Sequence, residues 1–225
     1  MRRSFLLLLS ILLATMLPAP AEANAGVRKA QTRLNQLGCQ AGPVDGNFGE
    51  WTKAAVIRFQ SRHGMVQSGR LTTTTQRRLH ATTAKRCDRR PLPASGSGRR
   101  IVIAQGQNWV WLVRSNGTVR AQGGIIDNPD VLSKGWHRVG SYCGRNPKIR
   151  RNHSSGGLVL ENFTRFSPCG VGFHRIPQRS SGAQIHADQL LGTNLRESHG
   201  CIRLSAAMAR TIWDFGTVGT RVRVI

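Results

Sequence analysis

The chain has 225 residues, of which 33 are Lys or Arg and 10 are Asp or Glu, so its formal net charge is +23 at pH 7. This length accommodates one large domain or two small ones, and a charge of this sign predicts an anionic partner. The Arg residues are spread along the chain and are not interleaved with aromatic residues, which argues against nucleic acid as that partner.

The N-terminus has the pattern of a secretory signal peptide. Basic residues at positions 2 and 3 precede an apolar run over residues 5–13, and the segment closes on Ala23-Asn24-Ala25. This run is shorter than the roughly 20 apolar residues that a membrane-spanning helix needs. We therefore predict that residues 1–25 are a signal peptide cleaved before Gly26, and that the mature protein is secreted and has no membrane span.

The next segment has the periodicity of three short helices. Apolar residues recur at helical spacing over residues 27–37, and Gly38 follows as a terminator. A second helical run, over residues 55–63, ends at Gly64. A third begins in a cluster of threonines that offer N-caps and covers residues 72–79.

This helical segment carries the pattern of a known module. The residues in question are Leu34, Leu37, Asp45-Gly46, Phe48-Gly49, Thr52, Ala55-Val56, Phe59-Gln60, Gly69 and Leu79. Together they resemble a peptidoglycan-binding domain of the small three-helix type. The resemblance assigns residues 26–81 to this domain and implies peptidoglycan as its ligand.

The second half of the chain has strand signals. Residues 82–98 lack apolar periodicity and are predicted to be a linker. A strong hairpin-turn signal lies at residues 115–117. Short apolar or alternating runs that predict strands cover residues 101–103, 109–113, 124–126, 158–160, 171–174 and 221–224. One helix begins after Ser205 and stops at Gly216. The pattern predicts an α+β multi-domain protein, in which residues 99–225 form a mainly β domain with one packed helix.

The five cysteines are an odd number, although an exported protein normally pairs its thiols. Cys39 and Cys87 bracket the helical segment, and Cys143 and Cys169 both lie in the second half. Pairing by proximity predicts these two disulfides and leaves Cys201 free.

The surroundings of Cys201 are those of a reactive thiol. Positive charge at Arg203 and on nearby histidines predicts a lowered thiol pKa. Gly200 leaves room for a substrate, and adjacent backbone N–H groups are suited to hold an oxyanion. A cysteine nucleophile also needs a base, and two histidines upstream qualify. His174 ends a predicted strand, whereas His186 lies in a predicted loop.

The segment Ser198-His199-Gly200-Cys201-Ile202-Arg203 resembles the signature of the YkuD-type L,D-transpeptidases, and the resemblance covers about 125 residues, including Leu191-Gly192 and Gly219-Thr220. It implies a YkuD-like β-sandwich. It further implies that Cys201 is the nucleophile and that the residues around it, Ser198, His199, Gly200 and Arg203, form the substrate and oxyanion pocket. No metal or other cofactor is required.

The same resemblance bears on the base. Several members have His-x-x-Pro, which is found here at residues 174–177, and this favours His174. The number of residues between His174 and Cys201 is larger than is usual in the family, and the number between His186 and Cys201 is somewhat smaller. The spacing therefore does not decide between them, and His186 stays an alternative base. The Thr-Pro stretch common upstream of the site is not recognisable around residues 132–140.

The implied reaction is acyl transfer on peptidoglycan stem peptides, in which a thioester on Cys201 is resolved by an amine to give a 3-3 cross-link. An L,D-carboxypeptidase that uses water and a catalytically inactive cell-wall-binding protein are the alternatives. A zinc peptidase lacks a recognisable ligand spacing, and a papain-like peptidase has its cysteine ahead of its histidine. Because the chain has a large positive net charge, we also expect it to bind anionic cell-wall polymers. Arg-rich runs such as residues 86–90 are expected to be solvated.

Overall fold

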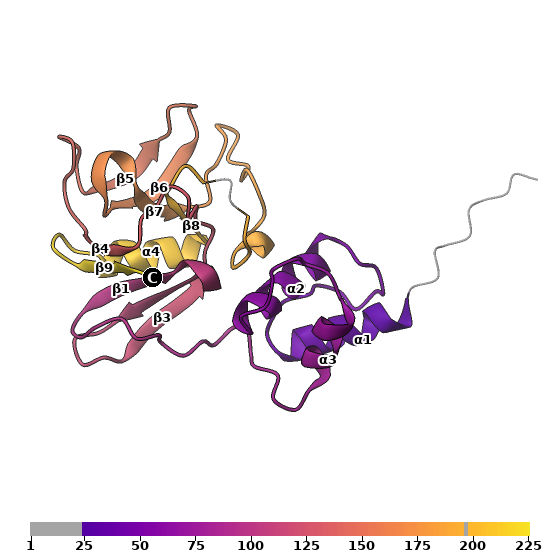
Figure 1. Cartoon of the computed structure of the whole chain (residues 1–225). Coiled ribbons are helices and arrows are strands. Elements are labelled where there is room, and N and C mark those ends of the chain that lie inside the picture. The colour runs from indigo at the N-terminus through magenta and orange to yellow at the C-terminus, as the bar shows by residue number, and fades with distance from the viewer. Residues whose placement is uncertain (1–23, 196–197) are drawn as a thin grey trace, which may run out of the picture.

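The computed structural model describes residues 24–195 and 198–225, and nearly all of the predicted signal peptide, residues 1–23, lies outside this part. Figure 1 shows a helical module beside a module built mainly of strands. The predicted fold class, a three-helix module followed by a mainly β domain with one packed helix, is confirmed. Among the described residues, no helix has the length and apolarity needed to cross a bilayer.

The helical module consists of α1 (Ala25–Gln36), α2 (Glu50–Arg62) and α3 (Thr73–His80). The side chain of Thr72 caps α3, as predicted, by accepting the N–H of Thr75 at 3.2 Å. The residues that fill the core of the module are Ala30, Leu34, Ala55, Val56, Phe59 and Leu79. The predicted disulfide between Cys39 and Cys87 is confirmed and closes the chain around this core.

The first helix is capped by Asn24, whose side chain accepts the N–H of Gly26 at 2.8 Å and that of Val27 at 3.2 Å. An N-cap of this kind contributes about 1 kcal/mol to helix stability. Cleavage before Gly26 would therefore remove the cap together with the first helical residue.

The Asp45-Gly46 turn of the peptidoglycan-binding pattern is held by a buried glutamine of α1. Gln31 donates to Asp45 Oδ1 at 2.8 Å and to Thr52 Oγ1 at 3.0 Å, and it accepts the N–H of Gly46 at 2.9 Å. The bond from Gln31 also holds the pKa of Asp45 below its usual range. One buried amide thus fixes the turn against the start of α2.

The β-rich module has two sheets. The first has the order β3-β2-β1-β9-β4 and the second β5-β6-β7-β8. The bounds of the first are β1 (Arg100–Ala104), β2 (Trp109–Val113), β3 (Val119–Gly124), β4 (Gly135–Arg138) and β9 (Arg221–Val224). Those of the second are β5 (Lys148–His153), β6 (Val159–Arg165), β7 (Gly172–Arg175) and β8 (Ile202–Leu204). Two pairings, β1 with β9 and β7 with β8, are parallel and the others are antiparallel.

The main core lies between these sheets and α4 (Ala206–Phe215), which packs against β6 and β7 (Figure 1). Ser205 caps α4, as predicted, by accepting the N–H of Met208 at 3.2 Å. The buried residues of this core include Ile101, Leu112, Phe166, Phe173, Ile202, Ile212, Phe215 and Val222. The predicted strand over residues 124–126 is not continuous, since β3 ends at Gly124 and Ile126 makes only an isolated bridge to Arg203.

A buried arginine fastens the two modules together. Arg58 of α2 is 4 % exposed and donates to the carbonyls of Cys39 at 2.9 Å and Gln40 at 3.0 Å in its own module. It also donates to the carbonyls of Leu191 at 3.1 Å and Gln189 in the β-rich module. Burial lowers the pKa of Arg58 to about 10. The guanidinium group of Arg58 therefore holds the two modules together through hydrogen bonds to both; we call it the clamp.

A second buried arginine lies in the segment between the modules. Arg90 donates to the carbonyls of Cys87 at 3.2 Å and Gln107 at 2.6 Å, and its guanidinium lies 4.2 Å from the ring centre of Trp109. The expectation that residues 86–90 are solvated is therefore wrong for Arg90, because its donors meet backbone carbonyls from both modules. Residues 81–99 contain no helix or strand, yet Leu92 packs against the strands of the first sheet.

Candidate active site

The predicted base lies on β7, and the predicted nucleophile directly precedes β8, its parallel neighbour. Phe173 of β7 pairs with Ile202 of β8, and both side chains point into the main core. Side chains alternate along a strand, so His174 and the residue before Ile202, which is Cys201, project from the opposite face. The charge of Arg203, the register partner of His174, affects the pKa of both groups. The face of the second sheet that points away from the main core thus carries His174 on β7, and Cys201 lies directly before β8.

His174 is buried and its ring is fixed. Its Nδ1 lies 2.5 Å from the carbonyl oxygen of Arg175, and the ring stacks on that of Phe163 at 6.0 Å between centres. Because a carbonyl can only accept, Nδ1 carries the proton, which leaves Nε2 as the basic nitrogen of the neutral ring. Burial lowers the pKa of His174 to about 4, and the charge of Arg203 acts in the same direction. The imidazole is therefore neutral at pH 7.

Cys201 is the free cysteine of the described residues and is partly exposed. Its thiol donates to the carbonyl of Gly170 at 3.5 Å. Burial raises the pKa of Cys201, and this outweighs the opposing effects of the Gly172 N–H and of the charges on Arg165 and Arg203. The predicted lowering of this pKa is therefore wrong in direction, because desolvation of the thiolate exceeds the attraction of the nearby cations.

Arg165 of β6 belongs to the site but was missed by sequence reasoning. It is 1 % exposed, it pairs in register with Gly172, and its charge reaches Cys201. Its Nε donates to the carbonyl of Asn146 at 3.2 Å, whereas Nη1 is buried and has no hydrogen-bond partner in the described part of the chain. The predicted strand here stopped at residue 160, so no pattern placed Arg165 on the face of the cysteine.

Gly172 provides the space between Arg165 and Cys201. A Cβ at this position would lie 2.6 Å from Cζ of Phe163 and 2.9 Å from the carbonyl oxygen of Thr164. Any other residue would displace the ring on which His174 stacks. The absence of a side chain at Gly172 therefore leaves the Phe163 ring, and the His174 ring stacked on it, in place.

The loop before the cysteine is braced by Ser198. Its hydroxyl donates to the carbonyl of Cys201 at 2.5 Å and accepts the N–H of Gly200 at 3.2 Å, and its own carbonyl accepts from Asn128 at 2.8 Å. Gly200 has a φ of +106°, and a Cβ there would lie 2.8 Å from Cγ1 of Val131. Ser198 and Gly200 thus shape the turn itself, and the N–H of Gly200, expected to hold an oxyanion, is engaged by Ser198.

The remaining predicted pocket residues are divided between surface and interior. His199 is exposed, whereas Arg203 is buried and exchanges two backbone hydrogen bonds with Ile126, at 2.9 and 3.2 Å. The two residues before Ser198 lie outside the described part of the chain.

His186, the alternative base, lies in a different environment. Its Nδ1 is 3.3 Å from the carbonyl oxygen of Ala187, in a segment without helix or strand. The side chain lines a cavity of about 560 Å³, whose other walls include Lys53 and Ile57 of α2 and Leu190. His186 therefore faces the junction with the helical module.

Cys143 is also disulfide-bonded. The side chain of Cys169, its predicted partner, lies outside the described part of the structure, so this pairing stays a prediction. Within residues 24–195 and 198–225, no three side chains of His, Cys, Asp or Glu are grouped so that they could hold a metal ion.

The fold and the site define a two-module protein in which a β-sheet domain carries a buried histidine on one strand and a free cysteine directly before the parallel neighbouring strand. Residues 98–224, more than half of the chain, match the family model of the L,D-transpeptidase catalytic domain, so the chain belongs to this family. Residues 23–79 match the model of a putative peptidoglycan-binding domain. The two matches support peptidoglycan as a partner and imply a protein that acts at the cell wall.

The chain is similar to solved structures. The L,D-transpeptidase of Xylanimonas cellulosilytica (residues 123–326) is 25 % identical, with a TM-score of 0.51, and the match covers 93 % of this chain and 100 % of that one. An L,D-transpeptidase of Stackebrandtia nassauensis is 18 % identical, with a TM-score of 0.46, over 90 % of this chain and 92 % of the other. No curated protein matches the sequence.

Proposed function

We propose that the protein is a cysteine-dependent L,D-transpeptidase that makes 3-3 cross-links between peptidoglycan stem peptides. The observation that carries this proposal is the placement of a buried neutral imidazole, His174, on β7 and of a free thiol, Cys201, directly before the parallel neighbouring strand β8. Membership of the L,D-transpeptidase family supports the reaction class.

The reaction has two acyl-transfer steps. Sγ of Cys201 attacks the carbonyl carbon of the stem's third residue, while Nε2 of His174 takes the thiol proton. The bond to the terminal D-alanine breaks, that amine leaves with the proton from His174, and a thioester remains. The amine of a neighbouring stem then attacks the thioester and passes its proton through His174 to the departing sulfur. The new amide is the cross-link, and the thiol is regenerated.

The pKa directions indicate that the resting pair is a neutral thiol and a neutral imidazole. Burial disfavours both charged forms, so proton transfer has to accompany attack on the carbonyl. Arg165 lies where it can stabilise the transient negative charge on sulfur, because its buried guanidinium interacts with the thiol across Gly172. The carbonyl of Arg175 fixes the His174 ring in the tautomer that leaves Nε2 basic.

His174 is the base in this proposal, and His186 is not. His174 is rigidly held on the strand next to Cys201, whereas His186 lines the cavity toward α2. A base on a strand fixed by stacking is better positioned than one in a loop. Replacing each histidine by Asn should therefore abolish acylation of Cys201 in the first variant and leave most of it in the second.

Cell walls treated with the wild type or with Cys201→Ser, then digested with a muramidase and resolved by mass spectrometry, test the reaction. New 3-3-linked dimers should form with the wild type alone. Stems trimmed to three residues without dimers would favour the carboxypeptidase alternative. Identical digests from both proteins, together with no adduct at Cys201 after incubation with a carbapenem, would favour an inactive cell-wall-binding protein.

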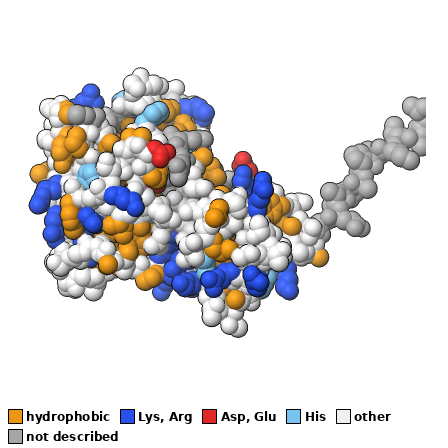
Figure 2. Space-filling view, viewed as in Figure 1, with side chains coloured by type: hydrophobic (Ala, Val, Ile, Leu, Met, Phe, Trp, Pro, Cys, Tyr) orange, Lys and Arg blue, Asp and Glu red, His pale blue; other side chains and the backbone are white. Residues whose placement is uncertain are grey.

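Residues 1–25 are proposed to direct export, and the basic surface is proposed to attract anionic polymers of the cell wall. Figure 2 shows Lys and Arg side chains over both modules on the visible face, with far fewer Asp and Glu side chains. A net charge of +23 favours association with polyanions, and this attraction weakens as salt is added. Retention of the protein on teichoic-acid-coated beads should fall as ionic strength rises.

A further inference from the structure

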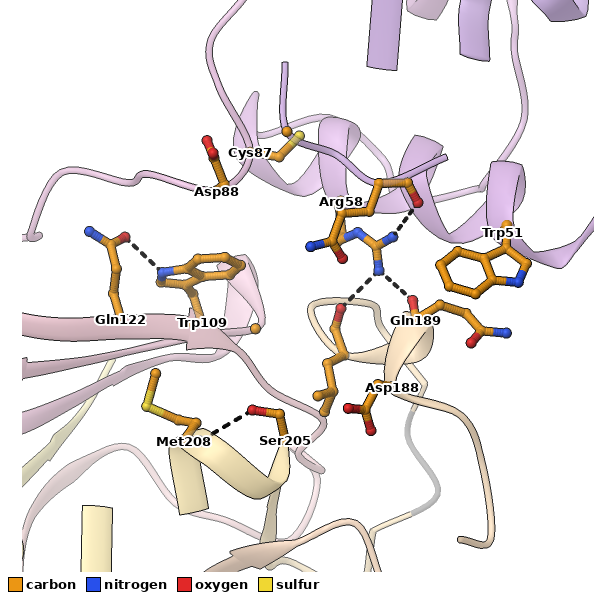
Figure 3. A pocket seen from close by; sticks show the side chains of 15 residues that line it. Trp51, Arg58, Cys87, Asp88, Trp109, Gln122, Asp188, Gln189, Ser205 and Met208 are labelled. Atoms are coloured by element: carbon orange, nitrogen blue, oxygen red, sulfur yellow. Dashed lines mark hydrogen bonds between the residues drawn. The ribbon is translucent and has the colours of Figure 1, made fainter. Parts of the chain in front are cut away.

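A cleft of about 410 Å³ lies where the helical module meets the catalytic domain, apart from the face that carries Cys201. Its wall combines aromatic rings, amides and carboxylates from both modules (Figure 3). The polar and aromatic side chains that matter are Gln40, Trp51 and Asp88 from the helical side and Trp109, Asp188 and Gln189 from the catalytic side. A site built from two modules is an established place for ligands to bind.

The walls of this cleft are fixed relative to each other. Arg58 lines the cleft and donates to carbonyls on both sides, at Gln40 and Gln189 among others (Figure 3). Its donors are thereby engaged by the protein itself. The clamp preorganises the cleft and does not offer its charge to a ligand.

One of the two tryptophans of the cleft is exposed and available for stacking. Trp51 is 46 % exposed, which is unusual for so large an apolar side chain, and it flanks Arg58 on the side opposite Trp109 in Figure 3. Trp109 is only 6 % exposed, its Nε1 donates to Gln122 at 3.0 Å and Arg90 covers one face of its ring, so it forms part of the wall and leaves Trp51 as the exposed stacking face. Indole rings offer a broad apolar face against which a flat ligand can pack.

The polar groups favour a neutral ligand rich in hydroxyl groups. Asp88 is ionised, because Arg86 at 2.6 Å holds its pKa below the usual range, and Asp188 adds a second carboxylate. Arg86 balances the charge of Asp88, and the donors of Arg58 are engaged by backbone carbonyls, so these cations of the described wall are not offered to an anionic ligand. Carboxylates and the amides of Gln40 and Gln189 together accept from and donate to hydroxyl and acetamido groups. An aromatic face can pack against the apolar face of a sugar ring, while planar carboxylates and amides form hydrogen bonds with its hydroxyl groups.

The cleft is close to the catalytic segment along the chain. Asp188, Gln189 and Leu191 belong to the loop between His174 and Cys201. Ser205, which also lines the cleft, is four residues after Cys201 and hence at most about 14 Å away. An extended stem of three residues spans about 10 Å, so the two distances are comparable.

We propose that this cleft binds N-acetylated sugars of a peptidoglycan glycan strand and so presents an attached stem to Cys201. The second half of this inference, the presentation of the stem to Cys201, rests on the proposed function. Its first half, recognition of neutral sugars against Trp51, can be tested without any turnover.

The probe is N-acetylglucosamine tetramer, titrated into the full chain while tryptophan fluorescence and heat are followed. Trp51→Ala should weaken binding at least about tenfold, because the stacking face is lost, and Trp51→Phe should recover part of it. Asp188→Asn should weaken binding by a smaller factor. Trp136→Ala is the matched control, since Trp136 is 48 % exposed but lies on β4 outside the cleft, and its binding should equal that of the wild type.

Absence of binding to the wild type, or equal binding by the wild type and a Trp51→Ala variant with an unchanged melting temperature, would overturn the cleft proposal. Such a result leaves the acyl transfer intact if a carbapenem still acylates Cys201. Conversely, sugar binding without acylation or cross-linking would overturn the proposed function and retain the cleft as a sugar site. The two failures are therefore distinguishable.

Discussion

Replacing His174 by Asn should make the protein less sensitive to acid, because the buried ring is forced to stay neutral. The pKa of His174 falls from its ordinary 6.5 to about 4 in the folded state. Between these values the unfolded chain binds a proton that the folded protein does not, so the free energy of unfolding falls as the pH decreases from 6.5 towards 4. The full difference is about 3 kcal/mol, of which about 2 kcal/mol is lost between pH 7 and pH 5. Asn cannot titrate, yet it can still donate to the Arg175 carbonyl.

Urea unfolding at pH 7 and pH 5, followed by tryptophan fluorescence, measures this loss. Four of the five tryptophans lie in the catalytic domain, so the signal reports mainly on that domain. The wild type should lose about 2 kcal/mol more than His174→Asn over this range. His153→Asn, at an exposed position on β5, should behave as the wild type. Parallel losses in the wild type and His174→Asn would refute the conclusion that the ring is buried and neutral.

Three further changes test the clamp, the glycine at the site and the disulfide. Arg58→Met removes the hydrogen bonds to four carbonyls and should lower the free energy of unfolding by about 3 kcal/mol in urea titrations, with Arg58→Lys recovering only part. Gly172→Ala places a Cβ 2.6 Å from an aromatic carbon and should abolish carbapenem acylation as seen by mass spectrometry, whereas Gly156→Ala, with nothing closer than 3.9 Å, should not. The pair Cys39→Ser and Cys87→Ser opens a loop of 48 residues and should cost about 4 kcal/mol by circular dichroism; a loss under 1 kcal/mol would contradict the loop-closure estimate.

The elements with strong local signals could be predicted from the sequence. α1, α3 and α4 begin and end close to their predicted bounds, because capping residues mark their starts. The end of α2 was also predicted, but this helix begins at Glu50, five residues before the predicted start, since its N-cap, Gly49, offers no side-chain signal. The strands β1, β2 and β9 were found because they are apolar or alternate regularly. These are features that depend only on neighbouring residues.

The missed strands lack such signals for physical reasons. β4 and β5 are edge strands of their sheets and are rich in basic residues, as in the sequence Lys148–His153. Charged edge strands resist pairing with other chains, but they show no apolar alternation. β8 has only three residues, and its parallel partner β7 is far away in sequence. Strand pairing of this kind is set by the tertiary structure.

The roles of individual arginines could not be predicted from the sequence either. In a chain with 33 basic residues, a solvated position is the natural expectation for each one. Arg58, Arg90 and Arg165 are nevertheless buried, and the first two satisfy backbone carbonyls of both modules. Local sequence cannot reveal these acceptors, because they come from loops distant in the chain. The direction of the Cys201 pKa was wrong for a related reason, since burial is a tertiary property.

The long interval between His174 and Cys201 has a structural explanation. The residues after β7 run to the helical module, where the carbonyls of Gln189 and Leu191 accept from Arg58, and then return to Ser198 and the cysteine. A shorter connection could join β7 to β8 but could not reach α2. Because of this additional length, the connection between β7 and β8 both lines the cleft and leads to the turn that holds Cys201. A sugar held against Asp188 and Gln189 would contact the connection that leads from the base on β7 to Cys201.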